Sequence, residues 1–148
     1  EDLFAQNERK LLLIALTHRL CSIYSRKMMM QKGAIGRKHE LFMKLVHLIE
    51  KHYMEERGVE FYADKLCLSP KYVSALSKSL SGYTAQELVF KAIVRRSIFL
   101  LLNTRKSIQE ISDELHFPNA SYFGTFFKKH IGVSPQQYRA VYEQESEG

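Results

Sequence analysis

The sequence predicts an all-α protein in which two helix-turn-helix units are joined by a long connecting helix and preceded by a long N-terminal helix. Apolar residues recur at three-and-four spacing through most of the 148 residues, and almost no stretch alternates with a period of two. Seven glycines and three prolines mark the ends of these amphipathic segments. A stretch of the chain also repeats after 49 to 50 residues, which indicates two copies of one structural unit.

The first two helices are predicted from their apolar rows. The first covers residues 3–30, and its row is Leu13, Leu16, Leu20 and Ile23. Glycines in residues 31–37 predict a short flexible joint. The second helix is expected over residues 38–56, with Leu41, Leu45, Leu48 and Ile49 inward and Gly58 as its end.

The later helices are shorter, and capping residues predict where they begin and end. Ser69 precedes a proline at the first helical position, Thr84 and Ser107 are further N-caps, and Ser107 with Glu110 forms a capping box. The predicted helices cover residues 61–67, 70–81, 85–103, a short stretch after Ser107, 120–130 and a stretch from Pro135. Gly82 and Gly132 are the expected stops of the helices over 70–81 and 120–130.

Each copy of the repeat consists of a short helix, a tight turn and a second helix that ends in glycine. Ala63-Asp64-Lys65-Leu66 matches Ser112-Asp113-Glu114-Leu115 at an offset of 49 residues, and the second helices match at an offset of 50. This layout is a helix-turn-helix, expected here at about residues 59–82 and 107–132. Such a unit places its second helix in the major groove of DNA, and successive grooves lie about 34 Å apart on one face. Residues 70–81 and 120–130 are therefore the predicted recognition helices.

The composition favours a polyanionic partner and argues against several other classes of protein. Lys and Arg outnumber Asp and Glu by 22 to 16, for a net charge of +6. No apolar run reaches the about 18 residues of a membrane-spanning helix. The two cysteines and six histidines lack metal-ligand spacing, and no nucleophile lies in a recognisable catalytic setting, so neither an enzyme, a metal nor a cofactor is predicted. With no export signal and unpaired cysteines, a cytoplasmic setting is expected.

Taken together, these residues resemble the AraC/XylS family of bacterial transcription regulators. The residues that match its signature are Ser121-Tyr122-Phe123, Phe127-Lys128-Lys129, Gly132, Ser134-Pro135 and Tyr138-Arg139, with Ser107-Ile108, Glu110-Ile111 and Phe117 upstream and Leu68-Ser69-Pro70-Lys71-Tyr72-Val73 in the first unit. The resemblance covers about residues 38–142. It implies a DNA-binding domain over residues 38–148, preceded by a linker or dimerisation segment in residues 1–37 and attached to an effector domain outside this chain.

Candidate DNA contacts are the small, polar and basic residues expected on the outer faces of the recognition helices, where Ser77 and Gly124 are also placed. The candidates for base readout are Lys71, Ser74, Ala75, Asn119, Ser121 and Thr125, and those for phosphate contact are Lys78, Lys128 and Lys129. Lys128 and Lys129 would equally suit a solvated helix end. In the resembled family, arginine is often found at the positions of Ala75 and Thr125, His116 stands where glycine is usual, and Ser112 where alanine is usual.

The remaining apolar residues of the recognition helices are assigned to the core. They are Tyr72, Val73, Leu76, Tyr122, Phe123, Phe126 and Phe127. Cys67 is expected to be a small buried hydrophobe.

The apolar row of residues 3–30 leaves two arrangements open. It pairs with the same row of a second chain, giving a homodimer, or it folds back onto residues 38–56. The leading function is sequence-specific binding of double-stranded DNA in transcription regulation, with activation as the expected role and RNA polymerase as a further candidate partner. The alternative is a protein-interaction module whose basic surface only keeps it in solution.

Overall fold

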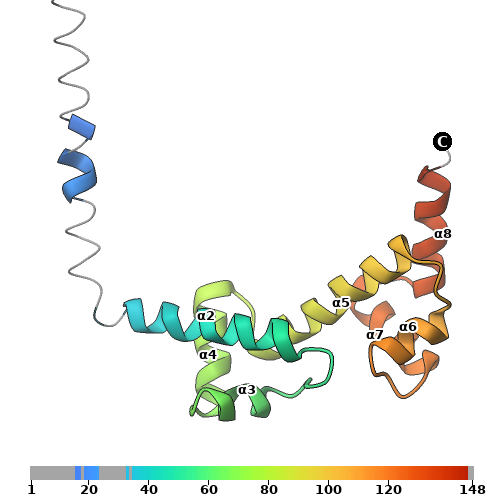
Figure 1. The fold of residues 1–148 in the computed structure, drawn as a ribbon, viewed down its shortest axis with the longest axis horizontal. Coiled ribbons are helices and arrows are strands. Elements are labelled where there is room, and N and C mark those ends of the chain that lie inside the picture. The colour runs from blue at the N-terminus through green and yellow to red at the C-terminus, as the bar shows by residue number, and fades with distance from the viewer. Residues whose placement is uncertain (1–15, 18, 24–32, 34, 147–148) are drawn as a thin grey trace, which may run out of the picture. The chain divides into compact units, whose positions relative to one another are not determined.

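The computed structural model describes residues 16–17, 19–23, 33 and 35–146, and all regular structure in these residues is helical, as predicted (Figure 1). The helices are α2 (Ile35–His52), α3 (Val59–Lys65), α4 (Pro70–Ser81), α5 (Ala85–Asn103), α6 (Ile108–Glu114), α7 (Ala120–Ile131) and α8 (Pro135–Ser146). The chain divides into two compact units, Glu1–Leu41 and Phe42–Gly148. No helix in the described part of the chain is long and apolar enough to cross a membrane.

The helix predicted over residues 3–30 lies mostly outside the described residues. Those that are described, residues 16–17 and 19–23, are helical. The predicted joint is wrong from residue 35 onward, because α2 already begins there and includes Gly36. An interior glycine costs a helix only about 1 kcal/mol relative to alanine, which neighbouring residues can offset.

The end of α2 and the start of α3 also differ from the prediction. α2 ends at His52, before the expected residue 56, and residues 53–55 form a turn in which the amides of Glu55 and Glu56 both donate to the His52 carbonyl. α3 begins at Val59, two residues earlier than expected, directly after Gly58. The predicted domain boundary between residues 37 and 38 falls inside α2.

The predicted N-caps are confirmed. The hydroxyl groups of Ser69, Thr84 and Ser107 accept hydrogen bonds from the backbone three residues on, over 3.1–3.2 Å. Glu87 and Glu110 complete capping boxes by accepting from the amides of Thr84 and Ser107. These hydrogen bonds favour the ionised carboxylates and so lower the pKa of both glutamates.

The two helix-turn-helix units have the same kind of turn and the same kind of helix end. Cys67 and His116, at equivalent positions, both have left-handed backbones, with φ of 55° and 56°. In both turns the next amide donates to the carbonyl five residues earlier, over 3.0 Å in the first and 2.9 Å in the second. Gly82 and Gly132 end the second helices with φ of 81° and 95°, where a side chain would be strained. The predicted burial of Cys67 is wrong, since the turn leaves it exposed.

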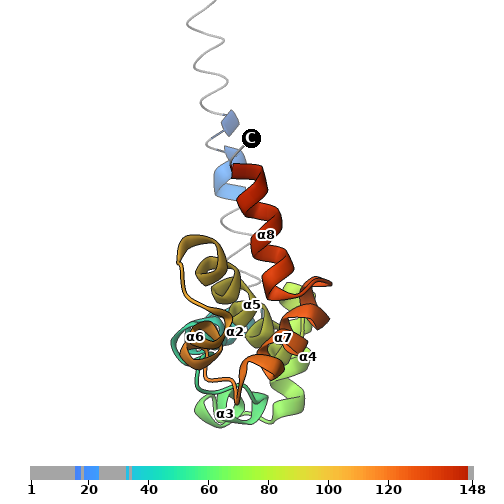
Figure 2. The ribbon, with the colours of Figure 1, turned by 90° about the vertical axis from the view of Figure 1, so that its right-hand side faces the viewer.

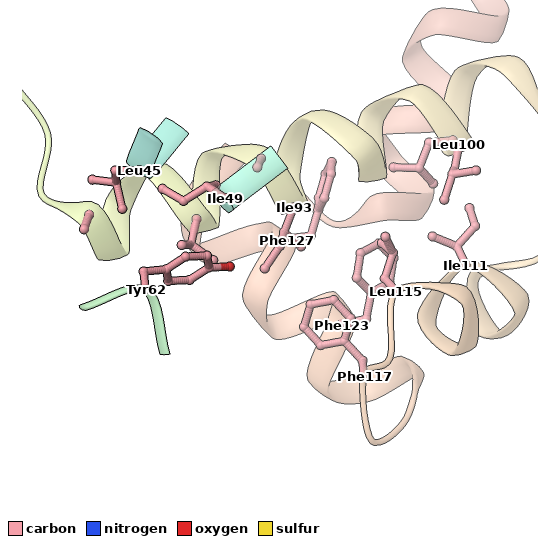
Figure 3. Packing of buried hydrophobic residues seen from close by; sticks show 14 of the residues in the cluster. Leu45, Ile49, Tyr62, Ile93, Leu100, Ile111, Leu115, Phe117, Phe123 and Phe127 are labelled. Carbon is pink, nitrogen blue, oxygen red and sulfur yellow. The ribbon is translucent and has the colours of Figure 1, made fainter. Parts of the chain in front are cut away.

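The core lies along α5, which packs against helices of both units (Figures 1 and 3). Near the start of α5, Leu45, Ile49 and Tyr62 are buried together. Ile93 and Phe127 lie together further along α5, and toward its end lie the buried side chains of Leu100, Ile111, Leu115, Phe117 and Phe123. One helix therefore supports both helix-turn-helix units.

Candidate nucleic-acid interface

The second helices of the two units, α4 and α7, form the candidate interface. Each is 12 residues long, and neither contains an acidic residue. In the view of Figure 2, α4 and α7 lie on the same side of α5. Each contains two lysines and no carboxylate, so both helices carry net positive charge, and the charge of Lys78 also acts on Glu87 of α5. This is the electrostatic pattern that a polyanion requires.

On α4, the predicted outer face is largely the observed one. Lys71, Ala75 and Lys78 are exposed and Ser74 is half-buried. The assignment of Ser77 to this face is wrong, because its side chain is fully buried and its hydroxyl donates to the carbonyl of Tyr83 over 2.7 Å. Ser77 therefore holds the loop after α4 and is unavailable to a ligand.

On α7, the exposed residues include Ser121, Thr125, Lys128 and Lys129. The Thr125 hydroxyl donates to the carbonyl of Ser121 over 3.0 Å. Asn119 is exposed, but it is also the N-cap of α7, and its carboxamide oxygen accepts from the backbone amide three residues on over 3.0 Å. One oxygen of this candidate base contact is thus already engaged in starting the helix.

Two tyrosines belong to this surface rather than to the core. Tyr72 and Tyr122 occupy equivalent positions of α4 and α7, and they are 42% and 63% exposed. The prediction that they are core residues is wrong, because each lies about 100° around the helix from its fully buried neighbour, Val73 or Phe123. Their identical placement 50 residues apart is the sequence signal that could have revealed a shared surface position. The core assignment is confirmed for Val73, Leu76, Phe123 and Phe127, whereas Phe126 is only partly buried.

At the end of α7, His130 behaves as an aromatic residue. Its ring centroid lies 4.5 Å from that of Phe126 and 5.4 Å from that of Phe90. Burial, with a smaller contribution from the charge of Lys129, lowers the pKa of His130 and favours the neutral imidazole. At neutral pH, the positive charge of this helix therefore comes from its two lysines.

The described residues offer little for other chemistry. No group of three or more His, Cys, Asp or Glu residues among them could hold a metal ion. A hollow of about 560 Å³ lies beside α5 and the end of α7, with Phe90, Val94 and Ile98 in its wall. The exposed polar and basic residues of α4 and α7 are therefore the main candidates for a functional surface among the described residues.

Comparison with known proteins gives consistent matches. Residues 62–140 match the family model described as a helix-turn-helix domain. The HTH-type transcriptional activator RhaS of Mannheimia succiniciproducens is 28% identical over 104 residues, which are 70% of this chain and 39% of RhaS. The C-terminal domain of AraT, a response regulator from Geobacillus stearothermophilus, is 33% identical with a TM-score of 0.64, over 68% of this chain and 84% of that one.

A further match shows likeness of fold alone. The DNA-binding domain of AdpA, a global transcriptional factor solved in complex with a target DNA, is 23% identical with a TM-score of 0.63, over 70% of this chain and 94% of that one. The present chain spans about two-fifths of the length of RhaS, and the matched region runs from α3 to α8. The chain belongs to the AraC/XylS family of DNA-binding transcription regulators, and residues 62–140 match the helix-turn-helix domain of that family.

Proposed function

We propose that α4 and α7 enter successive major grooves on one face of duplex DNA, and that the chain regulates transcription by recognising the base sequence there. The observation that supports this most directly is the pair of acid-free, lysine-containing helices of equal length on the same side of α5. A duplex presents such grooves about 34 Å apart, and each admits one helix.

Base readout is assigned to the small and polar residues of the two outer faces. On α4 these are Lys71, Ser74 and Ala75, and on α7 they are Ser121 and Thr125, with the amide group of Asn119 at the edge of the second site. Alanine and the threonine methyl group suit contact with the methyl group of thymine, whereas arginine is the usual partner of guanine. Phosphate contact is assigned to Lys78, Lys128 and Lys129.

Selection of bound duplexes from a random DNA pool, followed by titration of the selected duplex, tests this proposal. We expect the selected sequence to bind more tightly than random competitor, with an affinity that falls steeply as salt rises, because phosphate contacts release counterions. Equal binding of selected and random duplexes would exclude sequence recognition. No binding at low salt would favour the alternative, a protein-interaction module with an incidental basic surface.

Lys128→Ala should weaken binding to specific and random DNA to a similar extent. The exposed lysine in the last turn of α7 suits a phosphate, which is the same at every sequence. The slope of log affinity against log salt should fall by about one. Lys51→Ala, which removes the same charge from the exposed end of α2, is the matched control and should leave the slope unchanged. An unchanged slope for Lys128→Ala would remove this residue from the interface.

The wider role proposed for the protein follows its relatives. We propose that it acts in the cytoplasm as a transcription activator, with RNA polymerase as a further partner and an effector domain outside this chain; activation is the role that the name of RhaS states. We propose no enzymatic activity, metal or cofactor for this chain. One relative, AdaA of Bacillus subtilis, is named as both a transcriptional activator and a DNA repair enzyme, and the repair activity is not carried over.

We propose that residues 1–37 form a linker and dimerisation segment, with pairing through residues 3–30. Leu16, Leu20 and Ile23 are 57–59% exposed, and a row of three large aliphatic side chains favours association with an identical row. Leu13, the first member of the predicted row, lies outside the described residues. We expect sedimentation to show a dimer that becomes a folded monomer when the chain starts at Lys38. A monomer in both cases, at high micromolar concentration, would contradict pairing.

A further inference from the structure

The loop between α2 and α3 contacts the turn of the second helix-turn-helix unit through Arg57. The guanidinium Nη2 donates to the carbonyl of Leu115, 58 residues further along the chain. The centre of the same guanidinium lies 4.0 Å from the centroid of the Phe117 ring. Leu115 and Phe117 flank His116, the left-handed residue of the turn that leads into α7. One side chain of the loop directly before the first unit thus contacts both sides of the turn that precedes the second recognition helix.

The loop that presents Arg57 is itself fixed at two points. The hydroxyl of Tyr62, on α3, donates to the carbonyl of Glu56 over 2.6 Å, and burial, aided by the charge of Glu56, raises the pKa of that phenol to about 12. The side-chain amide of Gln86, on α5, donates to the carbonyl of Arg57 over 2.5 Å. These contacts tie the backbone beside Arg57 to α3 of the first unit and to α5.

The chemistry of this contact favours a link that persists at any physiological pH. Leu115 is the C-cap of α6, where carbonyls lack a helical partner and the helix dipole is negative. A guanidinium supplies a hydrogen-bond donor and a positive charge to that carbonyl and stacks its flat face on an aromatic ring. Burial lowers the pKa of Arg57, yet an arginine remains charged at any physiological pH.

This link differs in kind from the support that α5 gives. Both units pack on α5, and the contact of Arg57 with Leu115 and Phe117 joins the loop before α3 directly to the turn between α6 and α7. Such a second attachment restricts rotation of one unit relative to the other about α5. From the contacts of Arg57 we infer that it is a positioning residue which clamps the two helix-turn-helix units and thereby fixes the spacing between the two half-sites that α4 and α7 recognise. The inference rests on the proposed binding of two successive major grooves.

The test measures how strongly binding depends on the distance between half-sites. In the duplex selected from the random pool, one base pair is inserted into or removed from the spacer, which moves one half-site by about 34° around the helix axis. Affinities for the original and altered duplexes are then compared within each variant. The ratio of the two affinities does not depend on the fraction of folded protein, so a loss of stability alone does not change it.

We expect the unaltered chain to lose about tenfold or more in affinity with either altered spacer, which is comparable to a mismatched base pair. In Arg57→Ala this loss should shrink to about threefold or less, while the preferred bases within each half-site stay the same. Arg57→Lys retains a charged donor without the flat stacking surface, so its loss of affinity with an altered spacer should lie between those of the unaltered chain and Arg57→Ala. Arg95→Ala removes an arginine whose ion pair with Glu50 lies outside the clamp, and it should behave like the unaltered chain.

The outcomes separate the clamp from the proposed function. A spacing penalty in Arg57→Ala equal to that of the unaltered chain overturns the clamp and leaves DNA recognition intact. Absence of specific DNA binding by the unaltered chain overturns the proposed function, and the clamp with it. If Arg57→Ala does not fold, Gln86→Ala, which releases the loop while retaining the guanidinium, should also reduce the spacing penalty. An unreduced penalty in a folded Gln86→Ala then overturns the clamp.

Discussion

Replacing Phe123 with alanine should lower the free energy of unfolding by about 3–5 kcal/mol. Its side chain is fully buried, and its ring lies 5.3 Å from that of Phe117 and 5.9 Å from that of Phe127, centroid to centroid. Removing it leaves a cavity at the centre of the second unit, where three aromatic rings pack together. Urea unfolding followed by circular dichroism measures the change.

The control for this substitution is the next residue. Tyr122→Ala removes a ring of similar size that is 63% exposed, and we expect it to change the free energy of unfolding by less than about 1 kcal/mol. Phe126→Ala should fall between the two, because Phe126 is only partly buried. Equal effects of Phe123→Ala and Tyr122→Ala would contradict the packing described for α7.

Lys71→Ala should cost about 1–3 kcal/mol of binding free energy for the selected duplex and relax the base preference at one or two positions. Lys71 is exposed in the first turn of α4, where a recognition helix approaches base edges, and lysine can donate to the acceptors of guanine. Competition against duplexes that each differ by one base pair, at constant salt, measures the change in preference. Ser74→Ala should have an effect of the same kind.

Lys78 provides the matched control for Lys71, because it lies on the same helix and has the same charge. Lys78→Ala should weaken binding to selected and random duplexes alike, as expected for a phosphate contact. A loss in Lys71→Ala that is equal for both duplexes would mean that Lys71 also contacts only the backbone of the DNA.

Those parts of the fold that depend on local hydrogen bonding were predictable from the sequence. Ser69, Thr84 and Ser107 satisfy the free amides of a helix start, and Gly82 and Gly132 adopt a left-handed backbone, whatever the rest of the chain does. The end of α2 was predicted poorly because it depends on a turn without a distinctive residue.

The burial of some candidate-site residues is predicted wrongly for a different reason. Tyr72, Tyr122 and Ser77 were placed by residue type, yet the position around the helix decides their burial. A buried serine can satisfy its hydroxyl against a nearby carbonyl, and an amphipathic tyrosine can remain at the surface. Arg57 had no local signal, since its partners Leu115 and Phe117 lie in the other unit. Contacts between residues so far apart in the sequence can be identified only from the folded structure.

The matching ends of α4 and α7 have a consequence for how such a protein changes over generations. Both are 12-residue segments that follow a left-handed turn residue, start on a side-chain N-cap and stop at a left-handed glycine. In each helix, the boundaries satisfy the backbone independently of the residues that face outward. Mutation of those outward residues can therefore change the surface of one helix without disturbing the fold or the surface of the other helix. If the proposed function holds, the preferred sequence of one half-site can change while that of the other stays the same.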